Sequence, residues 1–294
     1  MINMRFIYSM SQPKAYIFST DPLDSANGKW DYGLLKEAFD RNHIEEIVVT
    51  NIPKDDRAFV VIPGQGNAGS EETINKEIAN LSRVVLFITG DEQGLFNADA
   101  IKHPNISIWI QYPHQKHEKY NKFFIGAPRH IKEYRPNYPI KTYDIYFGGQ
   151  ITHQRRQELA RIMPRMKNAL YCPTEGFAQG DLPKDYYHKL ASAKVAPAPS
   201  GAQVIDSFRF FEALEMLTLP VGDRKDSQGR EINYYDYVYG KSIPVQLTHD
   251  WHQLPKIMIE IMNDYPANMH KAVCWWLKYK RDFAFKVMED LNAS

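Results

Sequence analysis

The feature that most constrains the fold is an alternation of short apolar runs with helical patterns, which occurs twice. Five runs in the first half have the length and composition of buried strands: "YIFST", "IEEIVVT", "AFVVIPG", "RVVLFIT" and "ISIWIQY". Helical patterns lie between them, such as "WDYGLLKEAFDRN" and "SEETINKEIANLS". The second half repeats the alternation with "YDIYFGG", "NALYCP", "KVAPAPS", "LPVG" and "SIPVQL", and with helices expected near 153–166, 183–194 and 207–218. This pattern predicts an α/β protein with parallel sheets wrapped by helices.

Two matched halves predict two doubly wound, Rossmann-like domains that face a central cleft. The chain of 294 residues is long enough for both. We expect an N-terminal domain over 1–138, a C-terminal domain over 139–265, and a final helix over 266–294 that packs across both. The proline-containing stretch "APRHIKEYRPNYPIKTY" suits the linker between the two domains.

The composition indicates an ordered protein of the cytoplasm. The net charge is +1, 44% of the residues are hydrophobic and 24% are charged. No apolar stretch is long enough for a secretory signal or a membrane span, so we expect no membrane segment and a location in a bacterium or a virus-infected cell. Cys172 and Cys274 lie far apart, which favours structural thiols over a disulfide or a catalytic pair.

The loop "PGQGNAGSEE" carries Gly64, Gly66 and Gly69 in the G-x-G-x-x-G spacing, after a predicted strand and before a predicted helix. Such a loop can bind a dinucleotide, approach another ligand or acceptor in the cleft, or serve as a structural turn. It follows the third strand instead of the first, and Glu71 and Glu72 place negative charge where a pyrophosphate would lie.

Acidic residues follow two predicted strands. Asp91 and Glu92 come directly after "RVVLFIT", where a carboxylate at a cleft can act as a general base toward a hydroxyl nucleophile. The alternative is that they cap the following helix. Asp21 and Asp24, after the first strand, are in a similar position and are the reserve candidates.

Two stretches of the second half combine arginines with a helix start. In "YFGGQITHQRRQEL", Gly149 ends a strand, and Arg155 and Arg156 lie in the first turn of the next helix, where the macrodipole opposes them unless an anion is bound. The alternative is that one of the two points to solvent. In "DSFRFFEALEMLTLPVG", Arg209 and Glu212 are neighbours on a helix surface, either as an ion pair or as parts of a ligand site.

The second half resembles the donor-binding domain of exostosin-like glycosyltransferases, which have the GT-B fold. The resemblance covers roughly 143–225 and is most specific where Ser207, Arg209 and Glu212 match the family block S-x-R-x-x-E-A-L. It implies that Ser207 and Arg209 contact the diphosphate or sugar of a nucleotide sugar, that Glu212 binds ribose hydroxyls, and that Arg155 or Arg156 neutralises the diphosphate. Thr218 replaces the usual glycine after the helix.

The resemblance implies a glycosyltransferase, hexosyl or pentosyl, that inverts by direct displacement. Its co-substrate would be a nucleotide sugar such as a UDP-sugar, with no further cofactor. No Asp-x-Asp spacing occurs, which indicates a metal-independent enzyme, and His114 and His117 are more typical of a solvated loop than of a metal site.

The acceptor is the least constrained part of the hypothesis. The leading candidate is a hydroxymethylated base in DNA, because aromatic and basic residues alternate in "WWLKYKRDFAFK", although a packed amphipathic surface has the same pattern. A bacterial surface glycan is the alternative acceptor. Two other classes also remain: an NAD(P)-dependent oxidoreductase that uses the GQGNAG loop, and a non-catalytic module that binds nucleic acid or sugar.

Overall fold

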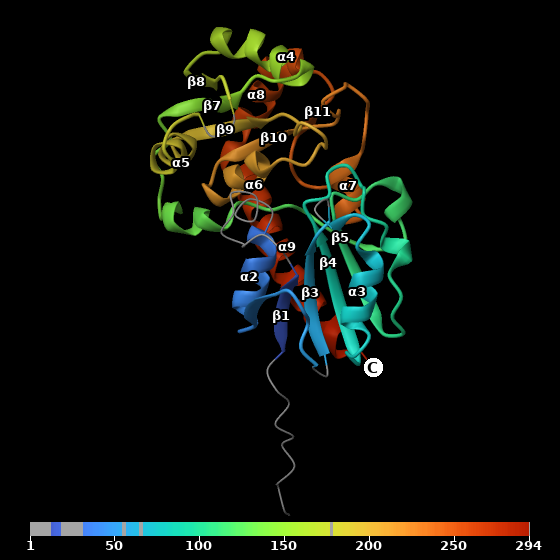
Figure 1. The fold of residues 1–294 in the computed structure, drawn as a ribbon. Helices are drawn as coiled ribbons and strands as arrows, with labels where there is room; N and C mark the ends of the chain where they lie inside the picture. Colours follow the sequence, from blue (N-terminus) through green and yellow to red (C-terminus); the bar gives the residue numbers. More distant parts are fainter. Residues whose placement is uncertain (1–12, 19–31, 55–56, 65–66, 177–178, 294) are drawn as a thin grey trace, which may run out of the picture.

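The computed structural model describes residues 13–18, 32–54, 57–64, 67–176 and 179–293. The first half forms a sheet of six parallel strands in the order β2-β1-β3-β4-β5-β6 (Figure 1). The strands are β1 (Lys14–Phe18), β2 (Glu45–Val49), β3 (Arg57–Pro63), β4 (Arg83–Thr89), β5 (Ile106–Gln111) and β6 (Asn121–Phe123).

The second half forms a sheet of five parallel strands in the order β11-β10-β9-β7-β8. The strands are β7 (Tyr143–Gln150), β8 (Ala169–Thr174), β9 (Ala193–Ala198), β10 (Leu219–Asp223) and β11 (Leu247–Thr248). When the strands of each sheet are numbered in chain order from the first strand of that sheet, both sheets have the order 2-1-3-4-5. The first sheet has one additional strand, β6, beside its fifth strand. The ligand crevice of such a sheet lies beyond the carboxyl ends of its first and third strands, which are β7 and β9 in the second sheet.

Helices cover both faces of the first sheet. The apolar side of α2 (Gly33–Arg41) packs on one face, where Phe39 meets Phe59 and Phe87. The helix α3 (Glu71–Ile78) covers the opposite face, and its Ile74 and Ile78 belong to a separate apolar cluster. The central strands are apolar on both faces, as expected for a sheet covered on both sides.

Helices also surround the second sheet. They are α4 (Gln154–Ile162), α5 (Pro183–Ala191), α6 (Phe208–Glu215), α7 (Tyr234–Tyr239) and α8 (Leu254–Asn263). Figure 1 shows α4 and α8 on one face of this sheet and α5 and α6 on the other. The segment between the two sheets contains a short 3-10 helix, η4 (Arg129–Tyr134).

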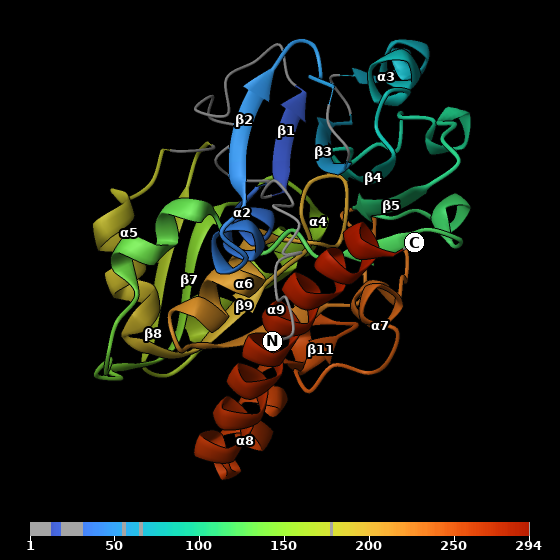
Figure 2. The ribbon, with the colours of Figure 1, turned by 90° about the horizontal axis from the view of Figure 1, so that it is seen from below.

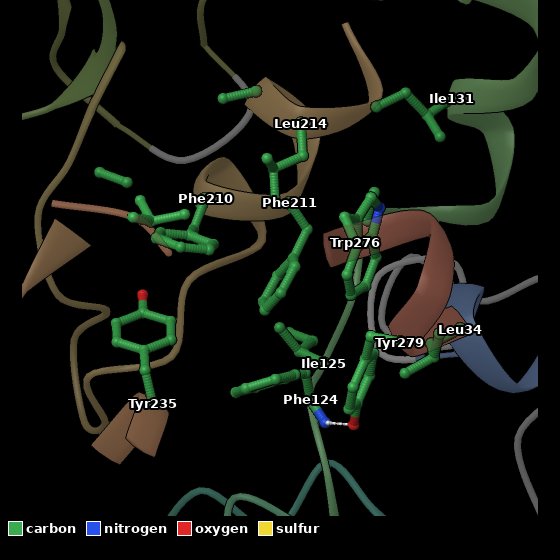
Figure 3. Close-up of a cluster of buried hydrophobic side chains, with 14 of the residues drawn as sticks. Leu34, Phe124, Ile125, Ile131, Phe210, Phe211, Leu214, Tyr235, Trp276 and Tyr279 are labelled. Carbon is green, nitrogen blue, oxygen red and sulfur yellow. Dashed lines mark hydrogen bonds between the residues drawn. The ribbon is translucent and has the colours of Figure 1, made fainter. Parts of the chain in front are cut away.

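The last helix, α9 (Tyr265–Asn292), contacts elements of both halves. It packs against α2, β3 and β4 of the first half and against α6 and β10 of the second (Figure 2). Figure 3 shows Trp276 and Tyr279 of α9 beside Phe124 and Phe211, and the backbone N–H of Phe124 donates to the Tyr279 hydroxyl at 3.2 Å. The aromatic residues of "WWLKYKRDFAFK" that face the sheets are therefore part of the core: Trp275, Trp276, Tyr279 and Phe283.

A cluster of four charged residues, the ion cluster, joins α2, α6 and α9 to the segment between the sheets; Glu37, Glu215 and Lys280 are buried, and Arg135 lies at its exposed edge. Lys280 is only 3% exposed, and its Nζ lies 2.6 Å from a Glu215 oxygen and 3.2 Å from a Glu37 oxygen. Arg135 lies 2.6 Å from Glu215 and 3.2 Å from Glu37. Two cations thus face two carboxylates at the contact between the halves.

The expected class, α/β with parallel sheets, is confirmed, while the GT-B arrangement and the domain limits 1–138, 139–265 and 266–294 stay predictions. The apolar runs expected as strands overlap β1 to β5 and β7 to β11, although "SIPVQL" shares only Leu247 with β11, whereas β6, α7 and α8 were not expected. Among the described residues, no helix combines the length and apolar character that crossing a membrane requires. Both cysteines are free thiols; Cys172 is half-buried and Cys274 exposed.

Candidate functional site

A cavity of about 600 Å³ lies at the carboxyl ends of β7 and β8. The first turns of α5 and α6 form another wall, and His130 of η4 contributes from the segment between the sheets. Its lining includes Gly149, Arg209 and Glu212, so three of the residues selected from the sequence meet in one place. This position beside the end of β7 adjoins the crevice expected for a 2-1-3-4-5 sheet.

Arg209 lies against the end of β7. Its Nε donates to the carbonyl of Gly148 at 3.2 Å, and a Cβ at Gly149 would lie 2.8 Å from the Arg209 Cζ and overlap its guanidinium nitrogen. Gly149 also has a φ of +149°, a conformation that favours glycine. In the described part of the chain Arg209 has no ion-pair partner, although it lines the cavity.

Arg156 is a second cation without a carboxylate partner in the described residues. It is 4% exposed and donates to the carbonyls of Gln150 at 3.2 Å and Ser200 at 3.3 Å, which joins the ends of β7 and β9. Its Nε has no partner there. Burial lowers the pKa of Arg156 to about 9, and the charge of Arg209 acts in the same direction. An anion bound in the cavity at Arg209 would reduce the repulsion between the two guanidinium groups.

The structure gives Arg155 a different role from the one implied by the resemblance. Its Nη2 lies 2.8 Å from Asp223, it also pairs with Glu158, and only 2% of it is exposed. Asp223 in turn accepts a hydrogen bond from the Trp251 indole at 3.1 Å. Arg155 is therefore neutralised inside the second half and does not line the cavity. The alternative that one of the two arginines points to solvent is wrong, because Arg156 is buried as well.

Glu212 is buried beneath the cavity, with 1% of its surface exposed. Its two oxygens accept hydrogen bonds from the hydroxyls of Tyr186 at 2.9 Å and Tyr187 at 2.8 Å. Burial raises the pKa of Glu212, while Arg209 and the two tyrosines act against that rise. Glu212 forms no ion pair with Arg209, so the simple surface pair considered from the sequence is wrong. The ribose contact stays a prediction.

Ser207 is the N-cap residue of α6 and is buried, but its side chain makes no capping hydrogen bond. It is not among the described residues that line the cavity. A contact between Ser207 and a diphosphate therefore stays a prediction.

Asp91 caps its own loop. One carboxylate oxygen accepts the N–H of Leu95 at 2.8 Å and the other that of Phe96 at 3.0 Å, and the residue is 2% exposed. The capping interpretation thus explains Asp91, although it caps a turn instead of a helix. Glu92 is partly exposed. Burial raises the pKa of Asp206 in the second half to about 7, and the charge of Glu92 adds to the rise.

The glycine-rich loop has structural reasons for two of its glycines. A Cβ at Gly64 would lie 2.7 Å from the Ile88 side chain and 2.8 Å from the Asp91 Cβ, and Gly69 has a φ of +86° in the turn before α3. Gly66, Asp21 and Asp24 lie outside the described residues.

No cluster of three or more metal-ligating side chains occurs in the described ranges. His114 and His117 pack against each other, and the backbone N–H of His114 donates to Nδ1 of His117 at 3.2 Å.

Sequence reasoning missed the aromatic wall of the cavity: His130, Tyr146, Tyr186 and Tyr187. The sequence predicts a helix near 183–194 but no role for its tyrosines, Tyr186 and Tyr187, whose hydroxyls donate to Glu212. The one available signal was the pair of adjacent tyrosines in the first turn of a helix that follows a strand end.

No protein-family model and no curated protein sequence matches the chain. Among solved structures, a similar one is that of AviGT4, a glycosyltransferase involved in avilamycin A biosynthesis. The TM-score is 0.49 and the identity 12%, over 96% of this chain and 99% of that chain.

Proposed function

We propose that the protein is a glycosyltransferase that uses a nucleotide-sugar donor, for which a UDP-sugar is our first choice. The observation that carries the proposal is the pair of arginines, Arg209 and Arg156, at the end of β7 without carboxylate partners among the described residues. Arg209 lines a cavity of about 600 Å³, which lies in the usual size range of small-molecule sites. A phosphate-bearing ligand fits such a site.

The chemistry of glycosyl transfer requires stabilisation of a nucleoside diphosphate as it leaves. Arg209 would contact the phosphates directly, and Arg156 would add positive charge from behind the strand end. The N-terminus of α6, which carries Arg209, contributes its dipole in the same direction. We propose that these groups neutralise the diphosphate without a metal ion.

We propose that Glu92 is the general base, and that Asp91 is a structural residue of its loop. Asp91 uses both oxygens on backbone N–H groups, whereas Glu92 is partly exposed and its charge acts on Asp206 of the second half. Removal of a proton from an acceptor hydroxyl by Glu92 would favour direct displacement with inversion at the sugar carbon.

A hydroxymethylated base in DNA stays our first acceptor and a bacterial surface glycan the second. Four aromatic residues of α9, Trp275, Trp276, Tyr279 and Phe283, do not support the first choice, because they are buried, whereas Phe285 is exposed. The acceptor is therefore best decided by assay, with hydroxymethylated DNA present or absent.

The first experiment measures donor binding and hydrolysis. The wild-type protein is titrated calorimetrically with nucleoside diphosphates and then incubated with a panel of nucleotide sugars, and released nucleoside diphosphate is quantified with and without modified DNA. Arg209→Gln should weaken nucleoside diphosphate binding by about 10- to 100-fold, because it removes a charge-assisted contact. The matched control is Arg161→Gln on the exposed side of α4, which should leave binding unchanged.

Two results would refute the proposal. One is stabilisation of the wild type by NAD(P) and by no nucleotide sugar, which would favour the oxidoreductase alternative. The other is equal affinity of the wild type and Arg209→Gln for every nucleoside diphosphate.

A further inference from the structure

Three tyrosines line the cavity, and one of their hydroxyls is unaccounted for. Tyr186 and Tyr187 donate to Glu212, but the Tyr146 hydroxyl has no hydrogen-bond partner among the described residues. The Tyr146 side chain is buried, with 1% of the residue exposed, although it forms part of the cavity lining. Buried hydroxyl groups nearly always have a partner, so an orphaned one beside a cavity points to a ligand.

The position of this hydroxyl is set by a glycine. A Cβ at Gly148 would overlap the Tyr146 oxygen and would lie 2.8 Å from its Cζ, so only glycine lets the hydroxyl lie over the strand. In the sheet register Gly148 pairs with Cys172 of β8, which also lines the cavity. Arg209 lies over the next residue of β7, Gly149. The hydroxyl thus lies over Gly148, one strand position away from the proposed phosphate contact at Gly149.

The hydroxyl is a donor over the whole physiological pH range. Burial raises the pKa of Tyr146, and Cys172, Asp181 and Glu212 contribute in the same direction. A buried hydroxyl without a hydrogen-bond partner destabilises the free protein, and this cost is removed when a ligand supplies an acceptor. Carbonyl and hydroxyl oxygens of a ligand are suitable acceptors.

We propose that the Tyr146 hydroxyl fixes the nucleoside part of the donor by a hydrogen bond to a ribose or base-carbonyl oxygen. This assignment rests on the proposed function. With the diphosphate at Arg209, the nucleoside lies over the end of β8. Tyr146 then contacts the nucleoside, and the phosphate that carries the sugar lies farther from Tyr146. Tyr146 is a specificity-determining residue in this arrangement and takes no part in bond breaking.

The test is Tyr146→Phe, with Tyr235→Phe as the matched control. Tyr235 is also buried, its hydroxyl also has no partner among the described residues, and its ring stacks on Phe210 at 4.5 Å without lining the cavity. Neither substitution removes a hydrogen bond from the free protein, so both variants should keep or slightly raise the wild-type melting temperature. Only Tyr146→Phe should weaken UDP binding, by about tenfold.

Inorganic pyrophosphate separates the nucleoside from the phosphates. The affinity of Tyr146→Phe for pyrophosphate should equal that of the wild type, while Arg209→Gln should bind both pyrophosphate and UDP less tightly. Titration with 2′-deoxy-UDP then tests one acceptor: a Tyr146→Phe penalty that disappears identifies the ribose 2′-hydroxyl, and one that persists identifies another ribose oxygen or a base carbonyl.

Each failure has a distinct meaning. A wild-type protein that binds no nucleoside diphosphate would overturn the proposed function and this inference with it. Wild-type binding that Tyr146→Phe leaves unchanged would overturn the Tyr146 assignment alone. An equal loss of pyrophosphate affinity in Tyr146→Phe would show that the hydroxyl meets a phosphate and would overturn the nucleoside contact.

Discussion

Replacing Lys280 by methionine tests how the ion cluster holds the two halves together. Burial alone would raise the pKa of Glu37, but the charge of Lys280, with Arg41 and Arg135, lowers it from 4.5 to about 2. A shift of this size corresponds to about 3 kcal/mol of interaction in the folded state. Lys280 also lies 2.6 Å from Glu215, so its removal leaves two buried carboxylates with less positive charge than before.

We expect Lys280→Met to lose about 3 kcal/mol in the free energy of unfolding at pH 7, since breaking a buried ion pair leaves an uncompensated charge. The assay is urea denaturation followed by tryptophan fluorescence. Lys278→Met, on the same helix, removes an exposed partner of Asp282 and should cost less than about 0.5 kcal/mol. Comparing the two variants separates the effect of losing a buried charge from the effect of replacing lysine by methionine.

The pH dependence of the unfolding free energy provides a second test. Because the folded pKa of Glu37 is depressed, its contribution is complete above pH 4.5 and is lost as the pH falls toward 2. The difference between the wild type and Lys280→Met should therefore be smaller at pH 3 than at pH 7. A loss below about 1 kcal/mol at pH 7, or a loss that is equal at both pH values, would refute this reasoning.

Three further predictions address single positions. Gly149→Ala should reduce nucleoside diphosphate affinity in calorimetry, because the new Cβ would overlap Arg209, and unchanged affinity would contradict the placement of that arginine. Asp223→Asn should destabilise the protein by about 3 kcal/mol in urea denaturation, because the buried Arg155 would keep only Glu158 as an ion-pair partner among the described residues; a loss below about 1 kcal/mol would argue against the Arg155–Asp223 pair. His43→Gly should raise the unfolding free energy by roughly 0.5–1 kcal/mol, because the exposed His43 has a φ of 55° after α2; a decrease would contradict this.

The fold was largely predictable because burial on both faces leaves a local mark. A strand such as β4, buried along nearly its whole length, appears in the sequence as an uninterrupted apolar run. The short β6 has a single buried residue, Phe123, after the polar Asn121 and Lys122, and a strand of three residues leaves no periodic signal.

The candidate site was only partly predictable because its chemistry depends on distant partners. The sequence brings Arg209 to a helix start, and that inference agrees with its place in the cavity. It cannot distinguish Arg155 from Arg156, because the difference lies in Asp223, which is 68 residues away. Likewise, the hydroxyls that occupy Glu212 come from α5, and only the packing of α5 against β7 and β9 brings them there.

The helix α9 has a consequence for the order in which the chain can fold. The Trp109 indole donates to Asp290 at 2.9 Å across 181 residues, and Phe283 packs on Trp109 and Phe123 at 5.3 and 5.5 Å. One face of the first sheet is thus completed by residues of α9, which are synthesised after both sheets. A nascent chain that has produced the whole first half still exposes this aromatic surface, so the native state of the first half becomes available only after α9 has been synthesised.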